Sequence, residues 1–359
     1  MTFWAKDISG FQVKKRSLEP PLHEQLEYLT PNDRFFVCNS GTTPSIDSQS
    51  YTLTVRGDSI ARDLTLSLAD LQAMPQRTVP AVIECAGNHR ALFEDVMGQP
   101  LNKRPHMTEL KWALGGVGMA EWRGVPLKSV LELAGVTENA HQVCFSGSET
   151  DSPEGLVRVP IPLAKAMDED TIIALEMNGE QLPPDHGFPA RAVVPGWVGT
   201  YSVKWLSDIE ISRNPFWVVR NTERYIMMGD LWPAETYAPA NGELITEQNL
   251  KSSLALPWPA HLSPGAHIIT GFARAPSTPI SKVEWSDDNG EHWSEAQLVG
   301  PNEKYGWTRF QFEWVASPGH QALMTRATDS DGNIQPETIP FNNGGYMFNA
   351  IHPHPIIVE

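Results

Sequence analysis

Glycine and proline occur 27 and 30 times in this chain of 359 residues, and so fill close to one position in six. Because both residues interrupt regular structure, this density predicts many turns and short elements rather than long helices. At roughly 150 residues per domain, the length predicts two domains, or three. A hydrophobic content of 41% and a charged content of 19% are typical of a folded globular protein. We therefore expect a globular chain of at least two domains.

The first two thirds of the chain carry signals for both helices and strands. Ser67 is a predicted N-cap for a helix that ends at Pro75, and Pro126 and Gly135 mark the start and end of a second helix. A third short helix is predicted from Pro162 to Met167. Apolar runs of strand type lie between them, at residues 51–55, 79–85, 172–177 and 192–194. This mixture predicts an α+β domain over residues 1–240.

Helix signals disappear in the last third. The proline-rich segment 233–239 is expected to form an extended crossover. Short strands are predicted at 268–274, 280–286, 307–314 and 322–328, with Asp-rich and Gly-rich turns at 287–290 and 329–332. Phe310, Phe312 and Trp314 share one face by the period of two. Residues 241–359 are therefore predicted to form an all-β sandwich of about 100 residues.

The charge balance limits the partners of this chain. Its 43 acidic residues outnumber 27 basic ones, which gives a formal net charge of −16. Nucleic acid is not expected as a partner, since neutralising phosphates requires a clustered basic face. An acidic surface instead favours encounters with a basic protein.

No membrane segment or leader is predicted. No stretch approaches the ~20 apolar residues that a spanning helix requires. The first ten residues lack the basic start and apolar core of a secretory signal. This predicts a cytoplasmic protein, although a chain whose leader had already been removed would look the same and would be periplasmic.

The three cysteines are Cys38, Cys85 and Cys144, and no two of them form a Cys-x-x-Cys pair. A disulfide framework, a cysteine-built zinc site and a haem-attachment motif are therefore not expected. Cys85 is the most informative of the three, because it ends a predicted strand and is followed by Ala-Gly-Asn-His-Arg. The cation of Arg90 close to a thiol favours a reactive or metal-binding thiolate. A buried core thiol is the alternative.

Several segments, taken in order, resemble the sulfite oxidase family of molybdenum-cofactor enzymes. The last third resembles that family's immunoglobulin-like dimerisation domain, through 283–286 and 290–293. Several motifs in order are far more specific than one short string. The segments in the first domain are 85–90 (CAGNHR), 110–112 (LKW), 120–127 (AEWRGVPL), 176–183 (EMNGEQLP), 185–191 (DHGFPAR), 194–199 (VPGWVG) and 203–206 (VKWL).

The resemblance implies one molybdenum–molybdopterin cofactor per chain, with the Cys85 thiolate as a metal ligand. It further implies that His186, Arg191 and Lys204 contact the pterin and its phosphate. Asn39 and Glu149 lie near other cofactor contacts of the family. Arg90 and Trp112 resemble residues that line the substrate pocket. Taken singly, each has a more ordinary interpretation: His186 as a turn residue, Trp112 as a core aromatic, and Arg191 and Lys204 as surface cations.

The chain departs from the family pattern at the substrate pocket. Sulfite-binding members carry arginines where this chain has Cys38 and Gly344, and a tyrosine around the position of Val157. A small dianion needs paired cations in a partly dry pocket. The resemblance therefore supports the cofactor more strongly than it supports the substrate.

The function that we expect is the two-electron oxidation of sulfite or a related sulfur compound. Electrons would pass to an external acceptor such as cytochrome c, because no haem domain or haem motif is found in the chain. A homodimer that forms through the sandwich is implied by the family. The alternatives are a related molybdenum enzyme that reduces an S-oxide or N-oxide, and a cofactor-free binding module.

Overall fold

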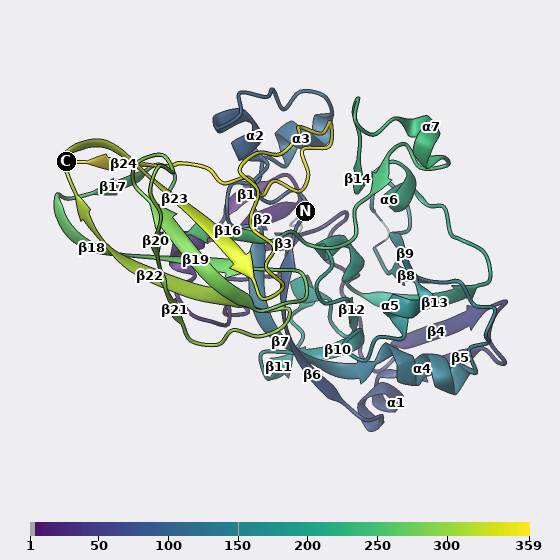
Figure 1. Cartoon of the computed structure of the whole chain (residues 1–359). Helices are drawn as coiled ribbons and strands as arrows, with labels where there is room; N and C mark the ends of the chain where they lie inside the picture. The colour runs from purple at the N-terminus through teal and green to yellow at the C-terminus, as the bar shows by residue number, and fades with distance from the viewer. Residues whose placement is uncertain (1–3, 150) are drawn as a thin grey trace.

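The computed structural model describes residues 4–149 and 151–359. Figure 1 shows the chain as two adjoining parts, with strands β16–β24 gathered at one end and the earlier sheets at the other. The fold is α+β in the first part and a β-sandwich in the second, as predicted. None of the helices in the described part is long and apolar enough to cross a bilayer. The division between residues 240 and 241 stays a prediction.

A five-stranded antiparallel sheet carries the strand that leads to Cys85. It is ordered β11–β10–β7–β6, with β12 paired to the other part of β10. Cys85 follows the last residue of β6, so the sheet fixes its position. The strands are β6 (Arg77–Glu84), β7 (Val117–Pro126), β10 (Ile172–Met177), β11 (Glu180–Gln181) and β12 (Arg191–Val193).

A second five-stranded sheet is ordered β5–β4–β13–β8–β9, and only its β13–β4 pair is parallel. Two small sheets complete the first part, β1–β2–β3 and β14–β15. The second five-stranded sheet comprises β4 (Thr52–Gly57), β5 (Leu64–Ser67), β8 (Gln142–Gly147), β9 (Arg158–Pro162) and β13 (Leu206–Ser212). The small sheets comprise β1 (Gln12–Lys14), β2 (Ser17–Glu19), β3 (Val37–Cys38), β14 (Ile226–Met227) and β15 (Glu243–Leu244).

The helices are short, in keeping with the glycine and proline content. Ser67 caps α1 through a reciprocal bond with Asp70, and Gly135 ends α4 with a φ of 73°. These two helices and α5 confirm the predictions. The α-helices are α1 (Leu68–Ala73), α2 (Ala91–Asp95), α3 (Pro105–Glu109), α4 (Leu127–Ala134), α5 (Leu163–Ala166), α6 (Val219–Thr222) and α7 (Ala234–Tyr237). The 3₁₀ turns are η1 (Leu22–Glu24), η2 (Pro184–His186) and η3 (Gly199–Tyr201).

One prediction, that for the segment 233–239, is wrong. The segment 233–239 was expected to be extended, but it contains the single helical turn α7. Pro233 precedes this turn, and proline is well tolerated at a helix start because its missing N–H has no partner to lose there. The prolines at 233 and 239 therefore bracket a turn instead of keeping the whole segment extended.

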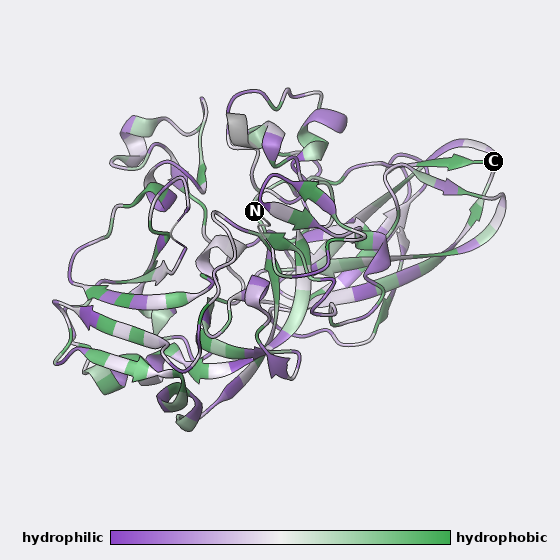
Figure 2. Ribbon diagram, turned by 180° about the vertical axis from the view of Figure 1, so that it is seen from behind, coloured by the Kyte–Doolittle hydropathy of each residue, from purple (hydrophilic) through white to green (hydrophobic). Residues whose placement is uncertain are grey.

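The sandwich consists of two sheets, β16–β18–β22–β21 and β17–β24–β23–β19–β20. Phe310, Phe312 and Trp314 are all buried on its inner face, as the alternation predicts. Figure 2 shows this alternation as hydrophobic and hydrophilic residues that succeed one another along the strands. The strands are β16 (Lys251–Leu254), β17 (Ala260–Leu262), β18 (Gly265–Arg274), β19 (Ile280–Ser286), β20 (Ser294–Glu295), β21 (Gln297–Val299), β22 (Trp307–Ala316), β23 (Gly319–Asp329) and β24 (His354–Val358).

The segment between β23 and β24 leaves the sandwich and crosses the first part of the molecule (Figure 1). The Met347 N–H donates to Ala86 O over 2.8 Å, and the Arg90 Nε donates to Gly345 O over 3.0 Å. The Asn343 N–H bonds Met228 O over 2.7 Å. Residues near the C-terminus thus contact the turn that follows Cys85.

Two buried histidines, one in this crossing segment and one at the start of β24, give the protein a pH-dependent stability. His352 and His354 are buried, and burial lowers the pKa of each to about 4 from the ordinary 6.5. Between pH 6.5 and 4 the unfolded chain therefore binds protons that the folded chain does not. We expect the free energy of unfolding to fall as the pH drops through this window, measured by urea titration. His354→Gln should weaken this dependence, whereas the same change at the exposed His320 should leave it intact.

Candidate active site

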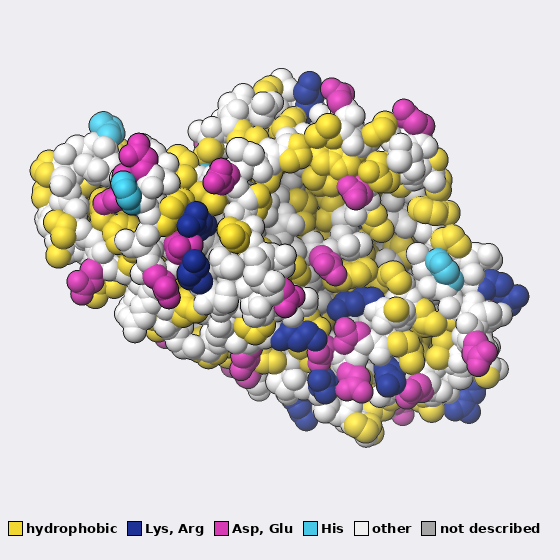
Figure 3. All heavy atoms as spheres, in the orientation of Figure 1, with side chains coloured by type: hydrophobic (Ala, Val, Ile, Leu, Met, Phe, Trp, Pro, Cys, Tyr) yellow, Lys and Arg dark blue, Asp and Glu magenta, His cyan; other side chains and the backbone are white. Residues whose placement is uncertain are grey.

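A cleft of about 720 Å³, including its part open to solvent, lies beside the end of β6. Figure 3 shows that this face of the molecule is hollowed, with hydrophobic side chains gathered around the hollow. The lining of the cleft comes from segments far apart in the sequence. The lining residues are Phe35, Phe36, Cys38, Ser40, Ile83, Cys85, Ala86, Glu149, Val157, His186, Arg191, Gly199, Thr200, Ser202, Val203, Lys204, Arg220 and Tyr225.

Cys85 is held by backbone bonds on both sides. Its N–H donates to Gly116 O over 2.9 Å, which continues the β6–β7 pairing, and its carbonyl accepts from the Asn88 N–H over 2.8 Å. The second bond closes a tight turn, so the thiol stands where the strand stops. Backbone bonds therefore fix the position of residue 85, from which the thiol projects at the end of the strand.

The Cys38 thiol, at the end of β3, lies beside the Cys85 thiol. Their mutual hydrogen bond raises the pKa of Cys85 and lowers the pKa of Cys38, and burial further raises the pKa of Cys85. The contact therefore favours a single thiolate shared by two sulfur atoms.

A group of buried cations forms another wall of the cleft. Burial lowers the pKa of Lys204 to about 8 and that of Arg191 to about 9, and it also lowers the pKa of His186. Arg191 donates to His186 O and Ser202 O over 2.9 and 2.8 Å, and Lys204 donates to Asp185 O over 2.9 Å. Among the described residues, neither Arg191 nor Lys204 forms an ion pair with a carboxylate within 4.0 Å. Buried cations without a counter-ion fit an anionic ligand such as a phosphate.

The structure brings most of the predicted cofactor residues together. Cys85, Glu149, His186, Arg191 and Lys204 all line the cleft. Asn39 is also part of this group, since its side-chain oxygen accepts a bond from Lys204. Burial raises the pKa of Glu149.

The two residues that were predicted to line a substrate pocket, Arg90 and Trp112, lie behind the wall of this cleft. Arg90 is buried, donates through Nη1 to Leu110 O over 2.7 Å, and stacks its guanidinium 5.0 Å from the ring of Tyr346. Trp112 is fully buried and packs edge-on against Phe36 at 5.9 Å. Both side chains therefore support the cleft wall in this structure.

Sequence reasoning missed two cleft residues, Arg220 in α6 and Tyr225 just after it. Tyr225 lines the cleft together with Val157, so a phenol hydroxyl is present in the lining although position 157 carries none. Both residues follow β13 in a segment without periodic hydrophobicity, and tertiary packing brings them to the site. The ring of Tyr225 stacks on that of Tyr346 at 5.7 Å, so the crossing segment supports it.

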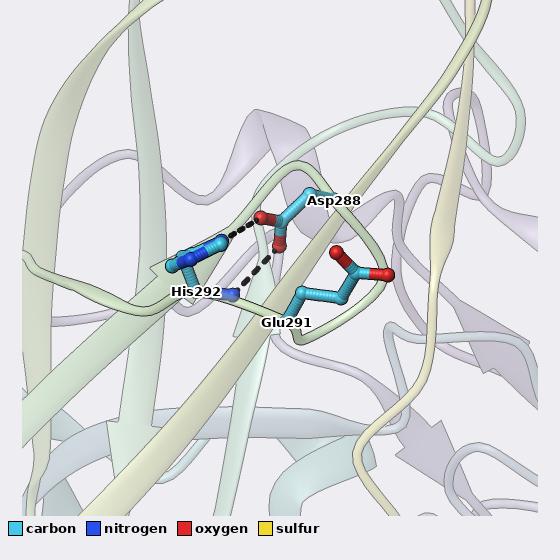
Figure 4. Close-up of side chains that lie close together, drawn as sticks. All are labelled: Asp288, Glu291 and His292. Atoms are coloured by element: carbon cyan, nitrogen blue, oxygen red, sulfur yellow. Dashed lines mark hydrogen bonds and ion pairs between the residues drawn. The ribbon is translucent and has the colours of Figure 1, made fainter.

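A second cluster of polar side chains lies far along the chain, in the turn between β19 and β20. Figure 4 shows Asp288, Glu291 and His292 close together, with two bonds from His292 to the Asp288 carboxylate. These bonds measure 2.7 Å from Nδ1 and 3.0 Å from the backbone N–H, and the Ser286 hydroxyl donates a third over 2.7 Å. The cluster is largely exposed, and its bonds stabilise the turn that the sequence predicts.

Comparison with known proteins agrees with this geometry. Residues 40–217 match the oxidoreductase molybdopterin-binding domain family, and residues 243–359 match the Mo-co oxidoreductase dimerisation domain family. Mitochondrial sulfite oxidase of Rattus norvegicus is 33% identical over 93% of this chain and 62% of its own length, so the chain spans less than two thirds of that relative. Sulfite oxidase of Gallus gallus is 33% identical over 94% of this chain and 75% of its own length.

A solved structure supports the same assignment. The sulfane dehydrogenase SoxCD from Paracoccus pantotrophus superposes with a TM-score of 0.81 and 26% identity, over 94% of this chain and 83% of that chain. Sequence, domain order and fold thus agree along nearly the whole chain. The chain belongs to the sulfite oxidase family of molybdopterin-binding oxidoreductases.

Proposed function

We propose that this protein uses one molybdenum–molybdopterin cofactor per chain to oxidise sulfite or a related sulfur compound by two electrons. The observation that carries the proposal is the cleft itself, whose lining includes the Cys85 thiol at a strand end together with Arg191 and Lys204, two buried cations that form no close ion pair with a carboxylate among the described residues. Soft thiolate sulfur suits a heavy redox metal, and the cations suit the phosphate of the pterin. The residues present therefore fit this cofactor.

In this proposal the cofactor, when bound, supplies the two-electron redox chemistry and the oxygen transfer. The protein positions it: Cys85 binds the metal through sulfur, and Lys204 and Arg191 neutralise phosphate charge. Phe35 and Phe36 contribute apolar side chains to the lining, and the drier environment that they provide strengthens electrostatic contacts in the cleft. Burial raises the pKa of Tyr225, so its hydroxyl stays protonated and can donate to a substrate oxygen.

The electrons would leave to an external acceptor such as cytochrome c. The net charge of −16 favours a basic partner protein. If docking is electrostatic, the rate of cytochrome c reduction should fall as ionic strength rises, since salt screens exposed charges. The family match over residues 243–359 supports a homodimer formed through the sandwich.

The test is a metal analysis combined with a substrate screen on the purified protein. We expect about one molybdenum atom per chain, and turnover of sulfite with an artificial one-electron acceptor. Full metal loading with no sulfite oxidation but with reduction of a sulfoxide or an N-oxide would support the alternative chemistry, which the absence of arginine at positions 38 and 344 favours. Protein that folds but binds no molybdenum under any expression condition would contradict both.

A further inference from the structure

We propose that Arg220 forms an oxyanion-binding subsite in the cleft, which holds the oxygen atoms of a sulfur oxyanion substrate. This inference rests on the proposed function and adds to it the residue that recognises the substrate. It supplies the cation that the sequence comparison found missing at Cys38 and Gly344. Arg220 comes from α6, a segment that none of the sequence motifs includes.

The guanidinium of Arg220 is held rigidly. Nη1 donates to the Thr200 hydroxyl over 3.0 Å, and Nη2 donates to the Ser40 hydroxyl and to the Glu154 carboxylate, the latter over 2.5 Å. The ring of Tyr225 lies 5.5 Å from the guanidinium carbon. A cation fixed on three sides loses little conformational entropy when it binds a ligand.

One donor of Arg220 remains unused. The side chain is 9% exposed, and its Nε has no hydrogen-bond partner among the described residues. A buried N–H without an acceptor is unfavourable, so native proteins rarely leave one. Because Arg220 also lines the cleft, an oxygen atom of a ligand in the cleft can satisfy it.

The side chains that line the cleft leave the subsite positive. Arg191, Lys204 and Arg220 are in the lining, and Glu149 is its one acidic residue. Glu154, which does not line the cleft, is the only ion-pair partner of Arg220 among the described residues. Arg220 also acts electrostatically on Cys38, which contacts Cys85, so an anion at Arg220 would lie close to the thiol that we propose as the metal ligand.

Two oxyanions could occupy such a subsite, the substrate or the phosphate of the cofactor. Lys204 and Arg191 already provide cations for the phosphate, and this favours the substrate at Arg220. The two sources are distinguishable, because losing a phosphate contact lowers cofactor content, whereas losing a substrate contact does not.

The experiment compares the molybdenum-loaded wild type with an Arg220→Gln, Glu154→Gln double variant, which removes the guanidinium without leaving a buried carboxylate unpaired. Sulfate, an unreactive oxyanion, is titrated calorimetrically into the oxidised protein, and KM and kcat for sulfite are measured with an artificial acceptor. We expect the Kd for sulfate and the KM for sulfite to rise on the order of ten-fold or more, the effect of losing one charge-assisted contact. Molybdenum and pterin content should not change.

Two control variants isolate the guanidinium. Arg224→Gln removes a charge near the same carboxylate, but its side chain is 43% exposed, and sulfate affinity should stay at the wild-type value. Glu154→Gln alone should retain or strengthen sulfate binding. An unchanged Kd in the double variant would overturn the proposal, and so would a loss of pterin, which would assign Arg220 to the cofactor. A wild type that binds sulfate through Arg220 but oxidises no sulfite would contradict the proposed function and leave the subsite standing.

Discussion

Cys85→Ser is expected to abolish turnover while the fold stays intact. A serine hydroxyl is a hard, protonated group and a poor ligand for a metal that thiolates bind well. The fold should survive, because the position of residue 85 depends on backbone bonds to Gly116 and Asn88 that serine retains. Molybdenum content per chain, sulfite turnover and the circular dichroism spectrum together measure the outcome.

Two matched variants make this result specific. Cys38→Ser changes the thiol beside Cys85 and should keep molybdenum bound, although its turnover is expected to change. Cys144→Ala alters a buried cysteine in β8 that does not line the cleft, and should behave like the wild type. Wild-type turnover in a folded Cys85→Ser protein would remove Cys85 from the metal site.

Glu84→Ala should produce the largest loss of stability of any single change considered. The buried Glu84 carboxylate lies 3.1 Å from the Lys251 ammonium, contacts Arg274, and accepts from the Asn88 amide over 2.8 Å. Its removal leaves two buried cations without a counter-ion. The cost of breaking such a buried pair is about 3–5 kcal/mol in the free energy of unfolding, measurable by urea denaturation.

The control is an exposed ion pair in the same sheet. Glu176 pairs with Arg123 over 2.6 Å, but both side chains are more than a third exposed, Glu176 at 35% and Arg123 at 46%. Glu176→Ala should therefore cost less than about 1 kcal/mol. Equal losses for the two variants would show that the buried network contributes no more than a surface pair.

Local signals made much of the fold predictable. Ser67 as an N-cap predicted the start of α1, and alternating aromatic residues predicted the inner face of β22. The prediction for the segment 233–239 was wrong, because the same two prolines are compatible with an extended chain and with a single helical turn between them. Contacts with residues that are distant in sequence decide whether such a segment is extended or helical. A local sequence pattern does not contain those contacts.

The site was predictable where its residues belong to contiguous motifs. Cys85, His186, Arg191 and Lys204 stand in such motifs, and the structure brings them to one cleft. Arg220 and Tyr225 were missed because their segment has no regular period and reaches the cleft through packing against Tyr346. Arg90 and Trp112 stand in motifs as well, yet the structure places their side chains behind the cleft wall.

The crossing segment between β23 and β24 has a consequence for inheritance. The ring of Tyr346 stacks on that of Tyr225, and the carbonyl of Gly345 accepts a hydrogen bond from Arg90, which follows the Cys85 turn. A nonsense codon at position 336 would delete this support together with strand β24. Alleles truncated at this codon should therefore behave as complete nulls.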